Sequence, residues 1–360
     1  MRILGSLRSG AVEHPELDGE VHADLDRAAA EGLSAIIARG GELLAQRMAS
    51  IERYLQRVSA EAGVPLGEHA RETIAAGGKR LRPLLVVLAA ESAGGPAPTQ
   101  EGEDALVRAA AAVELVHSAT LVHDDVIDGA QLRRGRPTVA HAAGRETAVA
   151  TGDLLFSRAF AELARNGEVL QLRALSDASS SLATGELLQR EDAYAAEVPV
   201  KRYMLRCELK TAALFEAACR LGALLAVEGS AALADALGAF ARRIGLAFQL
   251  LDDVLDVSGP VERTGKPRGT DLLDGTVTLP LILARQRDAR LAEEDLSRLR
   301  GAREAEALCD RIAATGALDD ARRHAFEIVA QAKQELPQCL PSGGFALLDM
   351  VADAVVERFS

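Results

Sequence analysis

The sequence predicts an all-α protein that folds as a single large helical bundle. Ala and Leu, the residues of highest helix propensity, are abundant in this chain of 360 residues, whereas aromatic residues make up only 3%. Apolar residues recur at helical spacing, and no stretch shows the apolar–polar alternation that is typical of a strand. Because small side chains dominate, we expect the helices to approach one another closely.

The expected helices are separated by clusters of glycine and proline. Residues 1–35 are mixed in composition and contain glycine, which indicates an N-terminal extension. Residues 36–360 show helical periodicity with no change of composition that would divide them, so one domain is expected there. Turns are predicted at 93–100, 166–168, 197–200, 258–280 and 340–344.

The net charge of the chain is −12, because 53 acidic residues outnumber 41 basic ones. This balance argues against sequence-independent nucleic-acid binding, which requires clustered Lys and Arg. The four cysteines form no CxxC pair, which predicts reduced thiols. The N-terminus lacks a signal-peptide pattern, and no run of about 18 uncharged apolar residues is present. We therefore expect no transmembrane segment and a cytoplasmic location.

The segment 102–128 shows helical periodicity best. Apolar side chains step by three and four along one face, namely Leu106, Ala109, Val113 and Val116. A polar line also follows this helix, through His117, Asp124 and Asp128. Steps of seven and four residues keep these three side chains on one face. The helix is therefore expected to direct polar groups into a bundle interior or a cleft.

The first acidic motif is "LVHDDVIDG", residues 121–129, which sets three aspartates among apolar residues. Asp124 and Asp128 are stacked at i and i+4, with Asp125 beside them. Two carboxylates at this short distance repel each other by roughly 1 kcal/mol in water and by more at a lower effective dielectric. Oxygen ligands of this kind suit Mg²⁺, which also accepts phosphate oxygens and water. A solvated acidic helix end before Gly129 is the alternative for this motif taken alone.

A second acidic motif, "FQLLDDVLDV" at residues 248–257, repeats the arrangement. It contributes Asp252, Asp253 and Asp256, and Gln249 lies on the same helix face. Two such helices facing each other would form a mouth of six carboxylates. The repetition favours a metal site over two unrelated helix ends.

Basic residues occur where an anionic ligand would need them. They lie in "GGKRLRP" (77–83), "RRGRP" (133–137), "ELKTA" (208–212) and "RTGKPRG" (263–269). Each segment alone is also consistent with a solvated surface charge. In an acidic chain, together they indicate sites for two anions, one bridged through Mg²⁺ and one bound directly by Lys and Arg.

These motifs, in this order, resemble those of the trans-isoprenyl diphosphate synthases of the polyprenyl synthetase family, long-chain type. The resemblance extends over roughly residues 40–350 and includes both acidic motifs, "LKTA" and "GKPRGTDL". It implies that residues 36–360 form the catalytic domain, with the isoprenoid synthase type I fold around a deep central cavity. It also implies a homodimer.

The resemblance implies a Mg²⁺-dependent prenyltransferase with about three Mg²⁺ ions per active site. The reaction would be head-to-tail condensation of isopentenyl diphosphate with geranyl, farnesyl or geranylgeranyl diphosphate, to give an all-trans polyprenyl diphosphate. An allylic cation would form and be kept from water in an apolar cavity.

The resemblance also implies roles for individual residues. The metal residues would be Asp124, Asp128, Asp252 and Asp256, with Asp125 and Asp253 in support. The allylic diphosphate would contact Arg133, Lys210 and Lys266. Isopentenyl diphosphate would be held by Lys79, Arg82, His117 and Arg134. The catalytic residues would be Lys210, Thr211 and Gln249, of which Thr211 and Gln249 would line the nascent cation. One departure is Thr276, which stands where the family often has a second loop lysine.

Product length is predicted from side-chain volume next to the first acidic motif. Ala119 and Thr120 are small, whereas short-chain members of the family commonly carry an aromatic floor there. Phe156 and Phe160 are candidates for a deeper floor. An open tunnel predicts a product of about 30 carbons or longer.

Four alternatives remain beside this interpretation. A geranylgeranyl diphosphate synthase would make a shorter product by the same chemistry. A terpene cyclase shares the first motif but does not need a second diphosphate site. A non-catalytic subunit of a heteromeric synthase would lack the aspartates, all six of which are present. An HD-type phosphohydrolase would use the pair His123–Asp124, with His69 or His117 as a further ligand.

Overall fold

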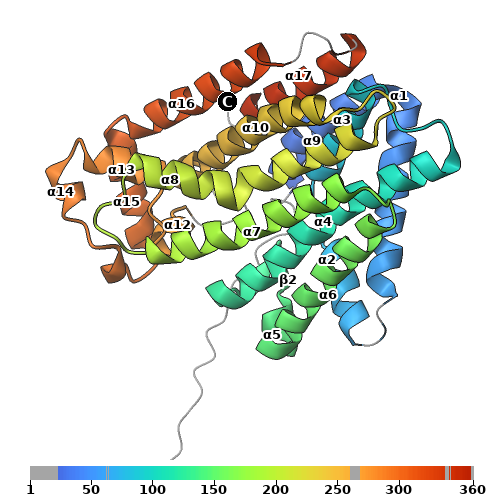
Figure 1. The fold of residues 1–360 in the computed structure, drawn as a ribbon. Coiled ribbons are helices and arrows are strands. Elements are labelled where there is room, and N and C mark those ends of the chain that lie inside the picture. The colour runs from blue at the N-terminus through green and yellow to red at the C-terminus, as the bar shows by residue number, and fades with distance from the viewer. Residues whose placement is uncertain are drawn as a thin grey trace, which may run out of the picture.

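The computed structural model describes residues 23–61, 63, 65–259, 268–336, 340 and 342–357. The described chain is an all-α bundle, as the sequence predicted (Figure 1). Its longer helices are α1 (Ala23–Ala60), α2 (Leu66–Ala75), α3 (Leu81–Ser92), α4 (Gln100–Asp128), α6 (Arg145–Ala164), α7 (Val169–Glu191), α8 (Val200–Cys207), α9 (Ala213–Leu225), α10 (Ala231–Ser258), α15 (Ala302–Ala314), α16 (Ala317–Gln334) and α17 (Ser342–Glu357).

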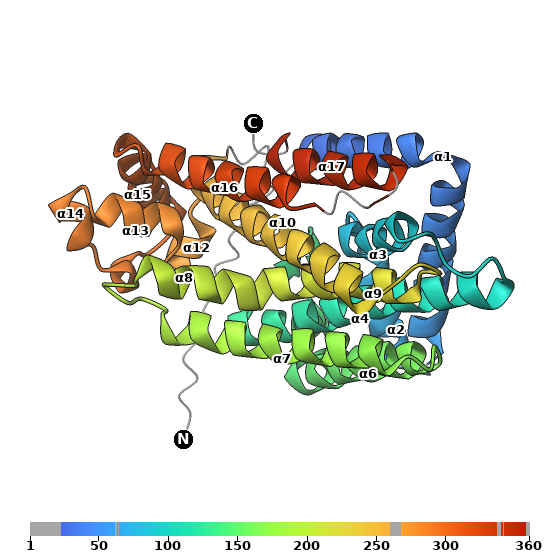
Figure 2. The ribbon, with the colours of Figure 1, turned by 45° about the horizontal axis from the view of Figure 1, so that its top comes forward.

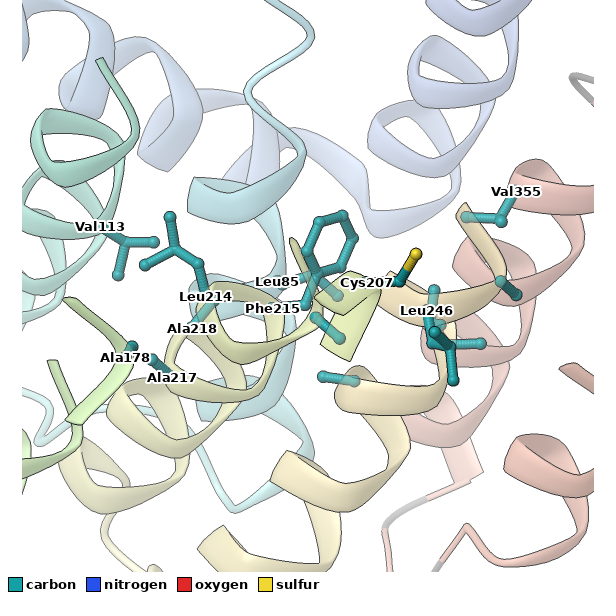
Figure 3. Close-up of a cluster of buried hydrophobic side chains, with 14 of the residues drawn as sticks. Leu85, Val113, Ala178, Cys207, Leu214, Phe215, Ala217, Ala218, Leu246 and Val355 are labelled. Carbon is teal, nitrogen blue, oxygen red and sulfur yellow. The ribbon is translucent and has the colours of Figure 1, made fainter. Parts of the chain in front are cut away.

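Helix α9 lies inside the bundle, where it packs against α3, α4, α7 and α10. The helix α1 lies at one end, and the short elements α12 (Thr270–Leu273), α13 (Leu279–Arg285), α14 (Ala289–Ala292) and η2 (Leu296–Arg298) gather with α15 at the other (Figures 1 and 2). Figure 3 shows part of the buried core, including Leu85, Val113, Leu214 and Phe215. Many core positions are alanines, which lets neighbouring helices approach closely.

Helix α4 forms because its termini are capped and one side is apolar. The Thr99 hydroxyl accepts a hydrogen bond from the Gly102 N–H at 3.1 Å, and Gly129 ends the helix with φ of 64°. By length and composition this helix could cross a membrane, but 72% of its apolar window is buried inside the bundle. Burial in the core therefore accounts for its apolar character.

Three local features differ from the sequence prediction or refine it. Residues 132–137 form a small hairpin of β1 (Leu132–Arg133) and β2 (Arg136–Pro137), where no strand was expected. A π-helix, η1 (Glu208–Ala212), continues α8. The expected boundary at residue 35 lies within α1, which kinks further on, at Gly41. The division into an extension and a catalytic domain stays a prediction.

The cysteines in the described part of the chain are Cys207, Cys219 and Cys309, and all three are buried free thiols. Burial raises the pKa of each, to about 12 for Cys309. They are therefore inert packing residues. Cys339 lies outside the described residues.

Candidate active site

A pocket of about 910 Å³, including the part that faces solvent, opens where the C-terminal ends of α4 and α10 meet α7, α8 and η1. The two acidic motifs face this one hollow, since Asp124 and Asp128 line it from α4 and Asp253 lines it from α10. The other lining residues are Leu121, Arg133, Gln189, Arg190, Arg206, Cys207, Lys210, Thr211, Gln249, Thr270, Asp271, Asp274 and Thr276. Lys266 lies outside the described residues.

Asp124 is a partly buried carboxylate in the pocket wall. Burial raises its pKa to about 6, and the charge of nearby Lys210 opposes this shift. The negative charge of Glu186 raises the pKa further. A cation in the pocket would favour the ionised form of Asp124, which is the behaviour expected of a metal ligand.

Asp125 is buried and paired with Arg133. The Arg133 guanidinium donates through Nε at 2.8 Å, and its Nη2 lies 2.7 Å from the same Oδ1 atom. The hairpin positions this arginine, because Arg133 pairs with Arg136 across a two-residue turn. Both turn residues, Arg134 and Gly135, have positive φ, at 52° and 72°. The ion pair with Arg133 holds Asp125 in place near the end of α4.

Asp128 is exposed at the mouth and paired with Arg190 of α7. The Arg190 Nε also donates to Glu186 at 3.0 Å, and Glu186 in turn accepts from Lys210. The charged groups of α4, α7 and η1 therefore form one connected network. A diphosphate that binds here must compete with these internal partners.

The buried carboxylate of the second motif is held by neutral donors. Asp253 is buried and accepts hydrogen bonds from the Tyr203 hydroxyl and the Gln249 amide, each at 2.7 Å. Burial raises the pKa of Asp253 to about 6, although both hydrogen bonds lower it. Asp256 accepts from the backbone N–H of Asp271 at 3.3 Å, and Asp252 is exposed.

The π-helix η1 presents Lys210 and Thr211 to the pocket. The Thr211 hydroxyl donates to Gln249 Oε1 at 2.6 Å, so Thr211, Gln249 and Asp253 form a chain of hydrogen bonds. A Cβ added at Gly185 of α7 would lie 2.5 Å from the Lys210 backbone nitrogen. Glycine is therefore needed for α7 to approach η1 this closely. Single π-turns often mark functional sites.

Besides the Lys210 and Arg133 side chains of the pocket, a second group of basic residues lies outside it. This second basic cluster consists of Lys79, Arg82, His117 and Arg134. The Arg134 guanidinium lies 3.2 Å from a Cβ built at Gly78, beside Lys79. Burial, opposed by the negative charge of Glu114 and assisted by the positive charge of Arg134, lowers the pKa of Arg82 to about 10. Among the described residues no group accepts a hydrogen bond from the buried Arg82 Nε. An unpaired donor in a positive cluster is a suitable partner for an anion.

His117 is neutral in the free protein. Burial and the positive charges of Arg82 and Arg134 lower the pKa of His117 well below its usual range. A neutral imidazole still donates one hydrogen bond to an anion. The structure therefore brings His117 together with Arg82 and Arg134, while Asp124 and Asp128, on the same helix, line the pocket described above.

The four predicted chain-length residues do not line the pocket described above. Ala119 is fully buried in the core, and the Thr120 hydroxyl donates to the His117 carbonyl at 2.8 Å. Phe156 and Phe160 of α6 are partly buried and pack against the core. Their effect on product length stays a prediction.

His123 faces away from Asp124, toward α6. Its Nε2 lies 3.2 Å from the Val149 carbonyl oxygen and 3.5 Å from Asp153, and its ring stacks near Phe156. Gly152 leaves the space that the imidazole occupies. This geometry argues against the HD-type phosphohydrolase, which needs His123 and Asp124 on one metal.

In the described ranges no three His, Cys, Asp or Glu side chains converge closely enough to hold a metal ion by themselves. The pocket nevertheless offers an all-oxygen donor set, with Asp124 and Asp128 on one side and the second motif on the other. Mg²⁺ is commonly bound by one or two carboxylates together with substrate phosphates and water. The residues present therefore fit Mg²⁺ bound together with a diphosphate.

Several residues of the pocket and its hydrogen-bond network were not predicted from the sequence. Gln189, Arg190, Arg206, Asp271 and Asp274 line the pocket, and Tyr203 and Glu186 bond to residues that line it. The polar group at 186, 189 and 190 has i, i+3, i+4 spacing and was a usable signal. Arg206 and Asp271 gave no such signal, because their place depends on how α8 and α12 pack in three dimensions.

Comparison with known proteins agrees with this geometry. A family model described as polyprenyl synthetase matches residues 65–314. Heptaprenyl diphosphate synthase component 2 of Geobacillus stearothermophilus is 41% identical over 242 residues, covering 67% of this chain and 73% of that protein. Geranylgeranyl diphosphate synthase of Methanosarcina mazei is 36% identical over 298 residues, covering 80% and 88%.

A solved structure is also similar. The polyprenyl synthase of Caulobacter crescentus, complexed with calcium and isoprenyl diphosphate, has a TM-score of 0.76 at 34% identity, and the match covers 96% of this chain and 100% of that one. Since the family model covers most of the chain and the fold agrees over nearly all of it, this chain belongs to the polyprenyl synthetase family, has the isoprenoid synthase type I fold, and is a prenyltransferase.

Proposed function

We propose that this chain condenses isopentenyl diphosphate head-to-tail with an allylic diphosphate to make an all-trans polyprenyl diphosphate of about 30 carbons or more. One observation supports this most strongly: Asp124 and Asp128 of the first motif and Asp253 of the second line one pocket with Lys210 and Arg133. The pocket thus offers carboxylates for metal ions and cations for a diphosphate.

The allylic diphosphate would lie between the two motifs. Asp124, Asp128, Asp252 and Asp256 would hold Mg²⁺, with about three ions in total. When bound, Mg²⁺ would neutralise the charge that develops on the leaving diphosphate. Lys210, Arg133 and Lys266 would donate hydrogen bonds to diphosphate oxygens. Asp125 and Asp253, each buried with protein partners, would orient the motifs.

Isopentenyl diphosphate would bind at the second basic cluster, held by Lys79, Arg82, His117 and Arg134. The unpaired Arg82 Nε and the neutral His117 support this assignment. Binding an anion there would satisfy the buried donor. Two separate diphosphate sites are what a condensation of two diphosphates requires and what a terpene cyclase does not need.

The hydrogen-bonded chain of Thr211, Gln249 and Asp253 would face the nascent allylic cation. Thr211 donates to Gln249 Oε1, which fixes the direction of the amide and of the hydroxyl. Oxygen dipoles held in this way stabilise a positive charge without reacting with it. The departing pyrophosphate would remove the final proton, and we assign no side-chain base.

The test is to incubate the protein with isopentenyl diphosphate, Mg²⁺ and a panel of allylic primers, and then to size the products. Polyprenyl products that depend on Mg²⁺ and on a primer are expected. If no chain is elongated with any primer, or if elongation persists in excess chelator, the proposed reaction is wrong.

The length of the product is proposed from the small side chains at Ala119 and Thr120. An Ala119→Phe variant places an aromatic ring beside the first motif and should shorten the main product to about 20 carbons. Ala119→Ser keeps the volume small and should leave the product length unchanged. A product of unchanged length in a folded Ala119→Phe protein would contradict the tunnel and favour a floor elsewhere.

We also propose a homodimer located in the cytoplasm. Exposed apolar side chains on α7, at Val169, Leu170 and Leu187, support an interface. A relative whose name includes "component 2" makes a second, different subunit the competing possibility. Light scattering on the purified chain should give twice the monomer mass of 37.9 kDa. A monomer that gains activity only with a second protein would contradict the homodimer.

A further inference from the structure

Arg206 of α8 is a pocket residue to which none of the functions above assigns a role. It lies one helical turn before Lys210, lines the same pocket, and is only 3% exposed. Its positive charge lowers the pKa of Asp253, so it lies on the side of the second acidic motif. A buried arginine in a pocket wall requires an explanation, because burying an incompletely paired guanidinium is unfavourable.

The other arginines and lysines that line the described pocket are paired with carboxylates. Arg133 is paired with Asp125, Arg190 with Asp128 and Glu186, and Lys210 with Glu186. Their donors are largely used in holding the site together. A diphosphate therefore has to draw these groups away from existing partners.

Arg206 is different, because part of its guanidinium has no acceptor. Its Nη2 donates to the Val277 carbonyl at 2.8 Å. Its Nη1 is buried and makes no hydrogen bond to any described residue. Its Nη1 lies 3.9 Å from Asp192 Oδ2, which is within ion-pair distance but too far for a hydrogen bond, and that oxygen also accepts no hydrogen bond from a described residue. The other oxygen of Asp192, Oδ1, accepts a hydrogen bond from Arg202 Nε at 2.5 Å, so Asp192 is shared between the two arginines.

Two further contacts hold Arg206 in this conformation. Its guanidinium lies 5.2 Å from the centre of the Tyr203 ring, and its Nη2 is tied to Val277, which follows Thr276 in the chain. Thr276 lines the same wall and carries no charge. Rotating Arg206 toward the pocket would give up the Nη2 hydrogen bond to Val277 and the ion pair with Asp192 in exchange for contacts with a bound anion. It would also bring a positive charge to a wall that carries Asp271 and Asp274.

We propose that Arg206 is a further diphosphate-binding residue, whose guanidinium moves into the pocket and donates to an oxygen of the allylic diphosphate and of the released pyrophosphate. This inference rests on the proposed function. Arg206 supplies a cation on the side of the second acidic motif, complementing Arg133 and Lys210 on the side of the first. Its planar fork suits a bidentate contact with phosphate oxygens.

The experiment measures binding of inorganic pyrophosphate by calorimetry in saturating Mg²⁺, with no turnover required. Arg206→Gln is expected to weaken pyrophosphate binding about tenfold and to raise the KM for the allylic primer by a similar factor. Arg206→Lys keeps the charge and should lose less. The KM for isopentenyl diphosphate should be unchanged in both variants, because that substrate binds at the other basic cluster.

The matched control is Arg202→Gln, on the same helix and bound to the same Asp192, but not part of the pocket. It should bind pyrophosphate like the unmodified protein. Thermal melts identify a loss of folding. If Arg206→Gln binds pyrophosphate normally, whatever its stability, the proposal is wrong and Arg206 serves only to hold the Val277 backbone. If the unmodified protein does not bind pyrophosphate with Mg²⁺, the proposed function itself fails.

Discussion

The two acidic motifs have the same spacing but are supported in different ways. In the first motif, at the end of α4, Asp125 and Asp128 are held by the guanidinium groups of Arg133 and Arg190. In the second, at the end of α10, Asp253 is held by a tyrosine hydroxyl and an amide, and Asp256 by a backbone N–H. Asp125 and Asp128 of the first motif therefore depend on ion pairs that a diphosphate can rearrange, whereas Asp253 of the second is held by neutral donors.

This difference indicates that the two motifs respond differently when a metal ion and a diphosphate bind. A carboxylate held by neutral hydrogen bonds has no guanidinium to release when a metal ion or a diphosphate binds. A carboxylate paired with arginine can exchange that partner for a metal ion, and the released arginine can then bind phosphate. The predictions that follow test each half of the comparison, beginning with the largest expected effect.

The largest effect is expected from removing one carboxylate of either motif. Asp124→Ala and Asp252→Ala should each reduce Mg²⁺-dependent turnover at least about 1,000-fold, because charge stabilisation on the leaving diphosphate is lost. Asp104→Ala, an exposed position at the far end of α4, should keep normal turnover. Circular dichroism checks that each variant folds. Substantial activity in either motif variant would remove the metal role of that motif.

The next effect concerns the ion pair of the first motif. Arg133→Gln leaves Asp125 buried without its cation and should lower the free energy of unfolding by about 2–3 kcal/mol. Because the lost interaction is an ion pair whose arginine is partly exposed, the difference from the unmodified protein should shrink in 1 M salt, taking about 3 Å as the screening length there. Urea denaturation at low and high salt measures this. A penalty that is the same at both salt concentrations would mean that the pair acts through packing.

A smaller effect is expected at the second motif. Tyr203→Phe removes one neutral hydrogen bond to Asp253 and should lower the free energy of unfolding by about 1–2 kcal/mol. Here the loss should not depend on salt, in contrast to Arg133→Gln. If the two variants respond to salt in the same way, the distinction between the motifs is wrong.

The smallest effect concerns Asp124 in metal-free protein. Its folded-state pKa of about 6 lies above the usual value of 3.8, so the ionised carboxylate is disfavoured in the fold. Stability should therefore fall as pH rises from about 4 through 6, and remain lower above that range. Asp124→Asn removes this penalty and should raise the free energy of unfolding at pH 8 by about 1 kcal/mol, with no gain at pH 4. Melting curves in chelator at both pH values test the sign, and a loss at pH 8 would contradict it.

Much of the fold and the main residues of the site could be predicted from the sequence, because they depend on local periodicity. The helix predicted over 102–128 is α4, and the positions of the acidic residues on α4 and α10 follow from helical spacing. The hairpin at 132–137 was missed, since two-residue strands have too few residues to show alternation. Its turn places Arg134 at positive φ, which only the three-dimensional structure reveals.

Other features could not be predicted because they arise from packing between distant segments. The π-helix η1 forms where Gly185 allows α7 to approach the Lys210 backbone. The pairs Asp128–Arg190 and Asp253–Tyr203 join residues 62 and 50 positions apart, and nothing in either local pattern indicates the partner. Lys266 lies outside the described residues, so its predicted contact with the diphosphate stays a prediction.

The most direct test is calorimetry of pyrophosphate binding in Mg²⁺, with Asp124→Ala and Asp252→Ala measured beside the unmodified protein and Asp104→Ala. If both motifs grip one diphosphate in the shared pocket, each motif variant should lose at least about tenfold in affinity, while Asp104→Ala loses none. Normal pyrophosphate affinity in either motif variant would mean that the two acidic clusters do not act on the same ligand.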